Sequence, residues 1–227
     1  GFQTILIGKE AGKVLNARNQ IFIGPQAGSS TTTGNNNVFI GYSAGASIST
    51  QSRNVVIGYN AMNTGSSNSG VIIGNEAGTL NNGDDNVFIG NLSGNQNNLG
   101  IRNTFIGSAA GGNNDSGYGN IFMGTAAGIN NITGLGNTFM GKEAGYNNLS
   151  GQGNIFMGYQ SGALNYSGTG NIFMGYQSGY NNQSDLNTFI GYKTGYNTDS
   201  SNTNGEFGTH TNNTYIGNLV GQLNNGN

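Results

Sequence analysis

The sequence predicts an all-β protein, a parallel β-solenoid (β-roll) of about 13 coils with a period of about 17 residues. A pentad of the form Asn-(Thr/Ile/Val)-Phe-(Ile/Met)-Gly recurs every 16 or 17 residues along the 227-residue chain, and only the last interval is longer, at 26. A second glycine follows each pentad glycine by four residues, except at Met62. So much glycine and asparagine makes a helical repeat costly. The pentads close at Gly8, Gly24, Gly41, Gly58, Gly74, Gly90, Gly107, Gly124, Gly141, Gly158, Gly175, Gly191 and Gly217.

The pentad has the alternation of a β-strand. In residues 103–107, Asn, Phe and Gly fall on one face of the strand, and Thr and Ile fall on the other. In a later repeat, residues 159–160 turn the corner, Ser161 and Gly162 begin a shorter return strand, and a segment rich in Asn, Ser and Gly leads to the next pentad. One period is one coil, so we expect residues 1–227 to form a single continuous array, with an irregular insertion near residues 199–211.

Stacking of the coils in register explains why like residues recur in columns. At a strand spacing of about 4.8 Å, the coils make a rod roughly 60 Å long, along which rings stack on rings and asparagine amides hydrogen-bond to one another. The phenylalanine ladder is Phe22, Phe39, Phe88, Phe105, Phe122, Phe139, Phe156, Phe173 and Phe189. The asparagine ladder that opens the pentad includes Asn37, Asn54, Asn86, Asn103, Asn120, Asn137, Asn154, Asn171, Asn187 and Asn213.

Both faces of the pentad strand are apolar, although a coil has only one interior. One face carries Phe; the other carries Ile or Met before the glycine and Thr, Ile or Val two places earlier. A second apolar ribbon of this length exceeds the patch that a soluble monomer usually exposes. We therefore expect a homo-oligomer, either a homotrimer or an end-to-end polymer. The sequence leaves open which face is the interior.

The repeat resembles the head repeats of trimeric autotransporter adhesins, and similar repeats occur in phage tail-fibre shafts. The unit Asn-Thr-Phe-Ile-Gly-Tyr-Lys-Thr-Gly at residues 187–195 and its copies carry the resemblance, which covers essentially the whole chain. The resemblance implies a left-handed parallel β-roll, with three rolls packed around a common axis. It also implies that Ile and Met point into the roll and Phe points toward neighbouring chains. This chain differs from the family in its longer period, and in having Phe where the family usually has Ala.

Composition argues against most chemistry. Seven Lys and Arg residues spread along the chain, with a net charge of -2, do not form a surface for nucleic acid. The chain has no cysteine and a single histidine, and the Asp84-Asp85 pair lacks the repeated Asp of a calcium-binding β-roll. No apolar run approaches the roughly 18 residues of a membrane span. We expect no catalytic site, no metal and no cofactor.

Two groups of residues are candidates for sites. The irregular insertion contains Glu206, Phe207 and His210, which would be the contacts of a recognition loop because insertions in solenoids collect on one face; a plain loop is the alternative. A second asparagine ladder lies seven residues after the pentad glycine, and five of its members begin Asn-x-(Ser/Thr) sequons. These candidate glycosylation sites are Asn114, Asn131, Asn148, Asn165 and Asn182, although turn chemistry alone also supplies such sequences.

These observations favour an extracellular structural fibre or surface adhesin segment, located at a cell surface or virion surface. Because the chain begins at Gly1 with no initiator methionine, we expect a processed product or part of a longer protein. The alternative is a module that binds glycans or a host surface, for which tyrosines just after the pentad glycine would offer aromatic faces. Ice binding is a third hypothesis, but the Thr column that it needs is interrupted by Ile and Val. The tyrosines are Tyr42, Tyr59, Tyr159, Tyr176 and Tyr192.

Overall fold

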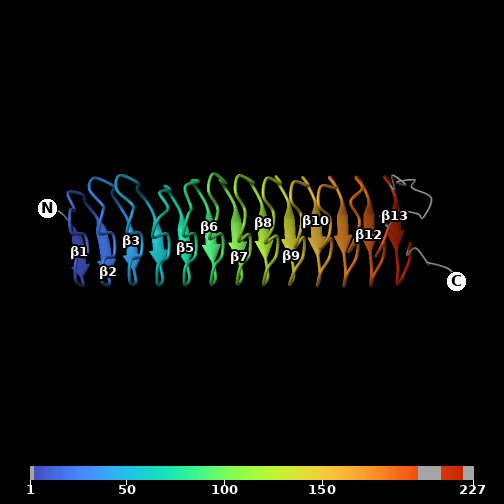
Figure 1. The fold of residues 1–227 in the computed structure, drawn as a ribbon, viewed down its shortest axis with the longest axis horizontal. Coiled ribbons are helices and arrows are strands. Elements are labelled where there is room, and N and C mark those ends of the chain that lie inside the picture. Colours follow the sequence, from blue (N-terminus) through green and yellow to red (C-terminus); the bar gives the residue numbers. More distant parts are fainter. Residues whose placement is uncertain (1–2, 199–210, 222–227) are drawn as a thin grey trace.

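The computed structural model describes residues 3–198 and 211–221, which form a rod of stacked coils (Figure 1). Thirteen short strands lie side by side in chain order and make one sheet. Every neighbouring pair is parallel, so the predicted parallel β-solenoid with a period of about 17 residues is confirmed. The strands are β1 (Thr4–Ile7), β2 (Gln20–Ile23), β3 (Val38–Ile40), β4 (Val55–Ile57), β5 (Val71–Ile73), β6 (Val87–Ile89), β7 (Thr104–Ile106), β8 (Ile121–Met123), β9 (Thr138–Met140), β10 (Ile155–Met157), β11 (Ile172–Met174), β12 (Thr188–Ile190) and β13 (Thr214–Ile216).

Equivalent residues of successive coils lie directly beside one another. Phe122 pairs with Phe139, and Phe139 pairs with Phe156. In both pairs the ring centroids lie 4.8 Å apart and the ring planes differ by 4°. This separation equals the spacing of strands in a sheet. The backbone ladder and the aromatic ladder therefore reinforce each other, because neither has to stretch to follow the other.

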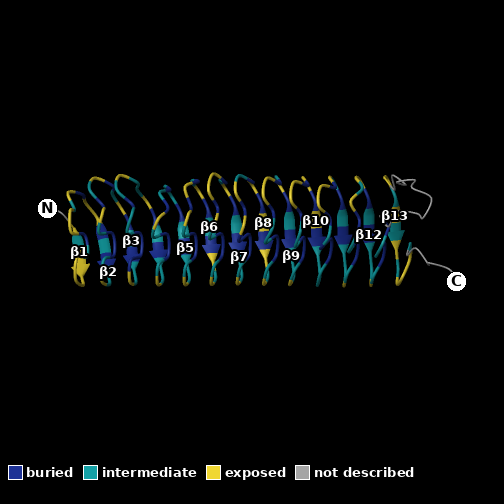
Figure 2. Ribbon diagram, in the orientation of Figure 1, coloured by how far each residue is buried: buried dark blue, intermediate teal, exposed yellow. Residues whose placement is uncertain are grey.

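The face of each strand that carries Asn and Phe turns into the coil. In the coil of β9, Asn137 and Phe139 are fully buried, whereas Thr138 and Met140 are partly exposed. Figure 2 shows the resulting alternation of buried and more exposed residues along the strands. The orientation implied by the family resemblance, with Ile or Met inside and Phe outside, is wrong for this chain. The segment that faces the strand contributes small residues such as Ala144 to the core, and the interior therefore has room for one large ring per coil.

The predicted return strand is also wrong, because this half of each coil consists of turns. Within the described residues, the second half of the coil contains no strand. The amide of Ala27 donates to the carbonyl of Gly24 at 3.2 Å, and the amide of Thr31 donates to that of Gly28 at 3.0 Å. Gln26 and Gly28 have φ angles of 60° and 55°, which a β-strand does not allow. These turns still hydrogen-bond from coil to coil, since the Gly28 amide donates to the carbonyl of Ala44 at 3.0 Å.

The pentad glycine is required by close approach of the next coil. Gly107 has a φ of +137°, and a Cβ atom added to it would lie 2.5 Å from the carbonyl oxygen of Gly124. Backbone cannot move away as a flexible side chain could, so any other residue at this position would separate the coils. The same arrangement recurs along the rod, which explains why the pentad always closes with glycine.

Candidate functional site

The asparagines that open the pentads form a buried ladder, as the sequence predicts. The backbone amide of Asn120 donates to Oδ1 of Asn103 at 2.9 Å, and the backbone amide of Asn137 donates to Oδ1 of Asn120 at 2.9 Å. Asn120 Nδ2 also donates to the carbonyl of Gly134 at 2.8 Å. These side chains thus join each coil to the next. Near the end of the ladder, the buried Nδ2 of Asn187 has no hydrogen-bond partner. The ladder holds the fold together and presents nothing to a ligand.

The second asparagine ladder is buried as well, which is incompatible with its candidate role in glycosylation. Asn131 Nδ2 donates to Oδ1 of Asn114 at 2.8 Å, and Asn148 Nδ2 donates to Oδ1 of Asn131 at 2.8 Å. A glycan is attached through this same nitrogen and needs solvent around it. A glycosylated side chain would therefore have to leave the core of the folded coil. All five sequon asparagines are fully buried: Asn114, Asn131, Asn148, Asn165 and Asn182.

The predicted recognition loop lies outside the described residues. Glu206, Phe207 and His210 all fall in the segment 199–210, so the structure places none of them. Over residues 3–198 and 211–221, no group of three or more His, Cys, Asp or Glu side chains lies together in a way that would hold a metal ion. The same part of the chain contains no helix long and apolar enough to cross a membrane. Two surfaces of the rod remain as candidates.

The first candidate surface is the outer face of the sheet. We define the outer face as the two columns of side chains that flank the central residue of every strand, a residue that is buried in β2 to β12. In β8 these are Ile121 and Met123, which are 43% and 37% exposed. Twenty-two of the 26 side chains in the two columns are apolar, the other four are threonines, and none is charged. This is the second apolar face that the sequence predicts.

One end of the outer face is hollowed. A cavity of about 490 Å³ lies over β1, β2 and β3, and its apolar lining comes from Ile5, Ile21 and Val38 of the outer face. Asn19 and Asn36 form its polar rim, where Asn19 Nδ2 donates to Oδ1 of Asn36 at 2.9 Å. An apolar floor with a polar margin is a common arrangement at contact surfaces between proteins.

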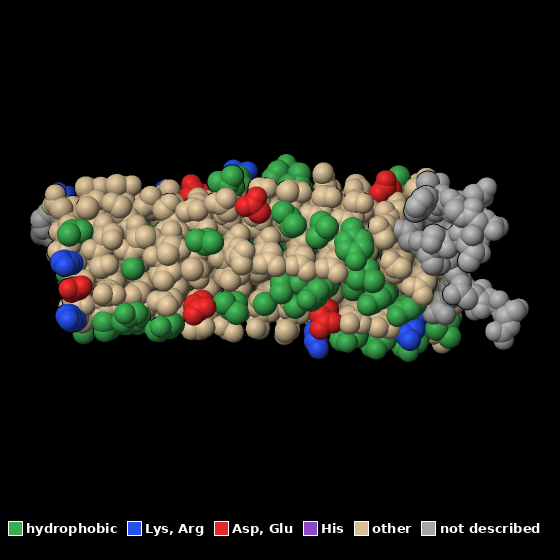
Figure 3. All heavy atoms as spheres, in the orientation of Figure 1, with side chains coloured by type: hydrophobic (Ala, Val, Ile, Leu, Met, Phe, Trp, Pro, Cys, Tyr) green, Lys and Arg blue, Asp and Glu red, His purple; other side chains and the backbone are tan. Residues whose placement is uncertain are grey.

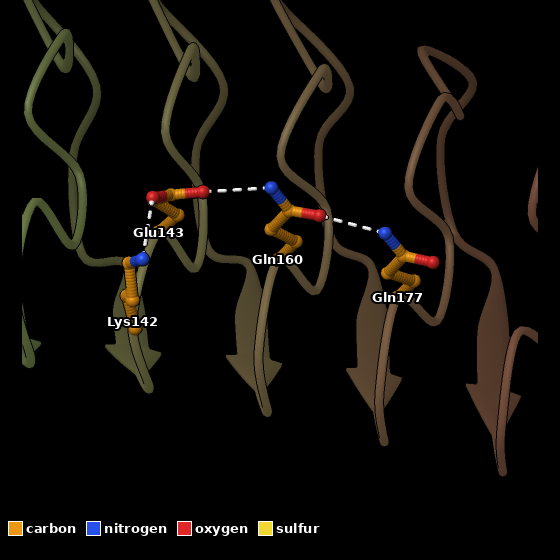
Figure 4. A network of polar contacts seen from close by, with 4 residues as sticks. All are labelled: Lys142, Glu143, Gln160 and Gln177. Atoms are coloured by element: carbon orange, nitrogen blue, oxygen red, sulfur yellow. Dashed lines mark hydrogen bonds and ion pairs between the residues drawn. The ribbon is translucent and has the colours of Figure 1, made fainter.

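The second candidate surface is a polar and aromatic strip on the turns that follow β9 to β12. Gln177 Nε2 donates to Oε1 of Gln160 at 2.7 Å, and Gln160 Nε2 donates to Oε2 of Glu143 at 2.7 Å. The Lys142 ammonium lies 3.4 Å from the other carboxylate oxygen of Glu143. Figure 4 shows these side chains in a row across three successive coils. All three residues have a left-handed backbone conformation, with φ of 59° at position 143 and 52° at positions 160 and 177. This shared conformation keeps the row in register.

Tyrosines flank this row. Tyr159 stacks on Tyr176 with centroids 5.1 Å apart, and Tyr180 stacks on Tyr196 with centroids 5.0 Å apart. The Lys142 ammonium lies over the Tyr159 ring, 5.7 Å from its centroid. Burial raises the pKa of Tyr180, and the charges of Tyr196 and Glu143 raise it further. Its phenol is therefore a neutral hydrogen-bonding group at physiological pH.

A hollow of about 290 Å³ opens in this strip. Its lining includes Glu143 and Gln160 from the polar row, and Tyr146, Ala163 and Tyr180 from the column beside it. The tyrosine column named in the sequence, which includes Tyr159, Tyr176 and Tyr192, does not line this hollow; its two tyrosines come from a neighbouring column that the sequence did not indicate as a site. The available signal was the interruption of the neighbouring tyrosine column at Ala163.

Comparison with protein-family models, with curated proteins and with solved structures finds no match to this chain.

Proposed function

We propose that this chain is a non-catalytic structural shaft that associates with further copies of itself through the outer face. The observation that carries the proposal is the absence of charge from an apolar ribbon that runs the whole length of the sheet. Most of a protein's exposed surface interleaves charged and polar groups, and a continuous apolar strip marks a contact surface. Homo-oligomerisation covers the whole strip with an identical strip, so that no further partner is required.

The dimensions of the outer face suit such a contact. Thirteen strands spaced at about 4.8 Å give it a length of roughly 60 Å. Its two columns lie about 7 Å apart along each strand, so with the side chains included it is about 10 Å wide. Each copy would bury roughly 600 Å², close to the ~800 Å² per partner of a standard stable interface. Flanking residues beyond the two columns would add to this area.

Sparse surface charge supports the same proposal. Figure 3 shows few charged side chains on the visible face of the rod. With only 7% charged residues in the chain, little electrostatic repulsion opposes the approach of a second copy. The resemblance to adhesin heads and phage tail-fibre shafts supports an extracellular place for the shaft, at a cell or virion surface.

A pair of charge substitutions tests the interface. Met140→Lys together with Met157→Lys would place two ammonium groups on the outer face, where burial against another copy costs several kcal/mol per unpaired charge. We expect the double variant to lose its assembly, and to become a 23.4 kDa monomer by light scattering. Circular dichroism checks that the coil persists, since both side chains point away from its core.

The matched control carries the same charges elsewhere. Ile132 and Leu149 are 42% and 37% exposed, and they lie on the loops between the turns and the next strand. Ile132→Lys together with Leu149→Lys should leave the assembly mass unchanged. Equal masses for both double variants, or a wild-type protein that is monomeric throughout, would overturn the proposal. Electron microscopy of the wild-type assembly then distinguishes lateral bundles of rods about 60 Å long from continuous filaments.

A further inference from the structure

The hollow in the polar and aromatic strip arises because one aromatic ring is missing from a column. The position five residues after the pentad glycine is Tyr146, Ala163, Tyr180 and Tyr196 in four successive coils. These coils are direct neighbours: the Asn147 amide donates to the carbonyl of Ala163 at 2.9 Å, and the Leu164 amide donates to that of Tyr180 at 2.8 Å. Ala163 has no ring to place between Tyr146 and Tyr180. All three side chains line the hollow.

The opening left by Ala163 is one ring thick. Tyr146 and Tyr180 belong to coils two steps apart, about 9.6 Å along the rod. A ring placed midway would lie about 4.8 Å from each neighbour. This is close to the 5.0 Å at which Tyr180 stacks on Tyr196 in the filled part of the column. The volume of about 290 Å³ lies just below the range for sites of drug-sized ligands, about 300–1,000 Å³, which is in keeping with a single small ring.

The polar groups at this opening suit hydroxyl groups. Gln160 uses one amide hydrogen to bond Glu143 Oε2, and its Oε1 accepts from Gln177. The second amide hydrogen of Gln160 and the remaining lone pairs of Glu143 are left for a ligand. A hydroxyl group can both accept from the first and donate to the second. The Asn147 side chain, which also lines the hollow, adds a further amide.

The charges at the site favour a neutral ligand. The carboxylate of Glu143 is already paired with the Lys142 ammonium, so an ammonium ligand would find its charge largely compensated. The lining residues include no Lys or Arg, which a phosphate would need. Two aromatic side chains, with donors and acceptors at one edge, match a saturated six-membered ring whose faces are C–H groups and whose rim carries hydroxyls.

We propose that this opening, the Ala163 slot, binds one pyranose ring of a neutral glycan. The ring lies between Tyr146 and Tyr180, over Ala163, and its hydroxyls bond to Gln160 and Glu143. This binding activity is additional to the shaft proposed above and does not depend on the outer face.

Filling the slot with the residue that the column otherwise carries is the test. Ala163→Tyr inserts a ring between Tyr146 and Tyr180, a stack of the kind that Tyr180 and Tyr196 already form. Ile129→Tyr is the matched control, because it adds a tyrosine to the same column on the far side of Tyr146 and leaves the slot open. Saturation-transfer NMR with glucose, galactose, mannose and N-acetylglucosamine, each at about 10 mM, detects even millimolar affinity.

We expect at least one of these sugars to bind the wild-type protein and Ile129→Tyr alike. Ala163→Tyr should weaken that binding at least tenfold. Absence of binding by all four sugars, or equal binding by Ala163→Tyr, would overturn the proposal. So would tetramethylammonium or inorganic phosphate binding at the slot in preference to every sugar. An unchanged assembly mass for Ala163→Tyr shows that the fold is intact, and separates this test from that of the outer face.

Discussion

Gly128 lies where a Cβ atom would come within 2.5 Å of the ring of Phe122. Gly128 belongs to the column of second glycines, and Phe122 to the aromatic ladder of the same coil. The same relationship holds between Gly162 and Phe156, where the distance is again 2.5 Å. The two most regular columns of the sequence therefore explain each other, because the glycine provides the space that the ring occupies.

Gly128→Ala should destabilise the protein by about 2–5 kcal/mol, since it adds overpacking of about 1–3 kcal/mol to left-handed strain of about 1–2 kcal/mol. Gly136→Ala is the matched control, with a φ of +62° and nothing within 4 Å of the added Cβ. It should lose only the strain. Urea unfolding followed by circular dichroism measures both variants. Equal losses would mean that the second glycine is not needed for packing against the ring.

Val56 and Met62 are the internal exception to this relationship. Val56 stands in the phenylalanine column, Met62 stands in the second-glycine column of the same coil, and both are fully buried. Ile72 of the next coil also lacks a ring but keeps Gly78, so the coil of Val56 is the one in which the flexible methionine side chain fills the space. Val56→Phe alone should overpack the coil and Met62→Gly alone should leave a cavity, each costing about 1–4 kcal/mol.

The double variant Val56→Phe, Met62→Gly should recover most of both losses, because it recreates the coil found elsewhere in the chain. The coupling energy in a double-mutant cycle should therefore reach about 2 kcal/mol, within the range for residues in direct packing contact. Urea midpoints of the four proteins give the cycle. If the stability losses of the two single variants simply added in the double variant, this would contradict the view that the side chains at positions 56 and 62 fill the same space.

Phe139→Ala should cost about 3–5 kcal/mol, as removal of a fully buried ring usually does. The ring stacks on both Phe122 and Phe156, so neighbouring coils lose contacts as well. Tyr118→Ala, at a side chain that is 51% exposed, is the control and should change stability little. Thermal unfolding compares the two variants. A similar loss for both would argue against the aromatic ladder as the source of stability.

Asn131→Ala should be more destabilising than Asn130→Ala, although the two residues are neighbours in the chain. Asn131 lies in the buried ladder. Its removal leaves the side-chain oxygen of Asn114 without its donor, and it leaves the side-chain amide of Asn148 with only its bond to the Gly151 carbonyl. Such orphaned groups cost about 1–3 kcal/mol each. Asn130 bonds Asn147 on the partly exposed side, where water can replace the bond. Denaturant midpoints that fall in the reverse order would contradict this assignment.

The period, the strands and the ladders could be predicted from the sequence because each depends on local alternation. Which face of the strand forms the interior of the coil could not be predicted, since both faces are apolar. In the structure, the small residues opposite the strand leave room for the Phe ring inside the coil. The prediction of a return strand was wrong because Gln160 and its equivalents adopt a left-handed φ, which is unusual for glutamine and has no signal in the sequence.

The burial of the sequon asparagines did have a signal. Ile48 stands seven residues after Gly41, in the same column as Asn131, and it is fully buried. An isoleucine in that column indicates an inward-facing position. The Ala163 slot had a comparable signal in the interrupted tyrosine column, but its depth depends on how the turns pack. The direction of hydrogen bonding along the second asparagine ladder had no signal in the sequence. Asn148 donates toward Asn131, in the preceding coil, whereas Asn165 donates to the backbone carbonyl of Asn182, in the following coil.

Protection of a single introduced thiol tests most directly whether copies of this chain cover the outer face. The chain has no cysteine, so Thr138→Cys places one thiol on the outer face and Thr133→Cys places one on an exposed loop. We expect alkylation of the Thr138→Cys thiol by a bulky maleimide to slow at least tenfold as protein concentration rises and copies associate. Alkylation of the Thr133→Cys thiol should keep its rate. Equal rates at every concentration for both variants would contradict burial of the outer face between copies.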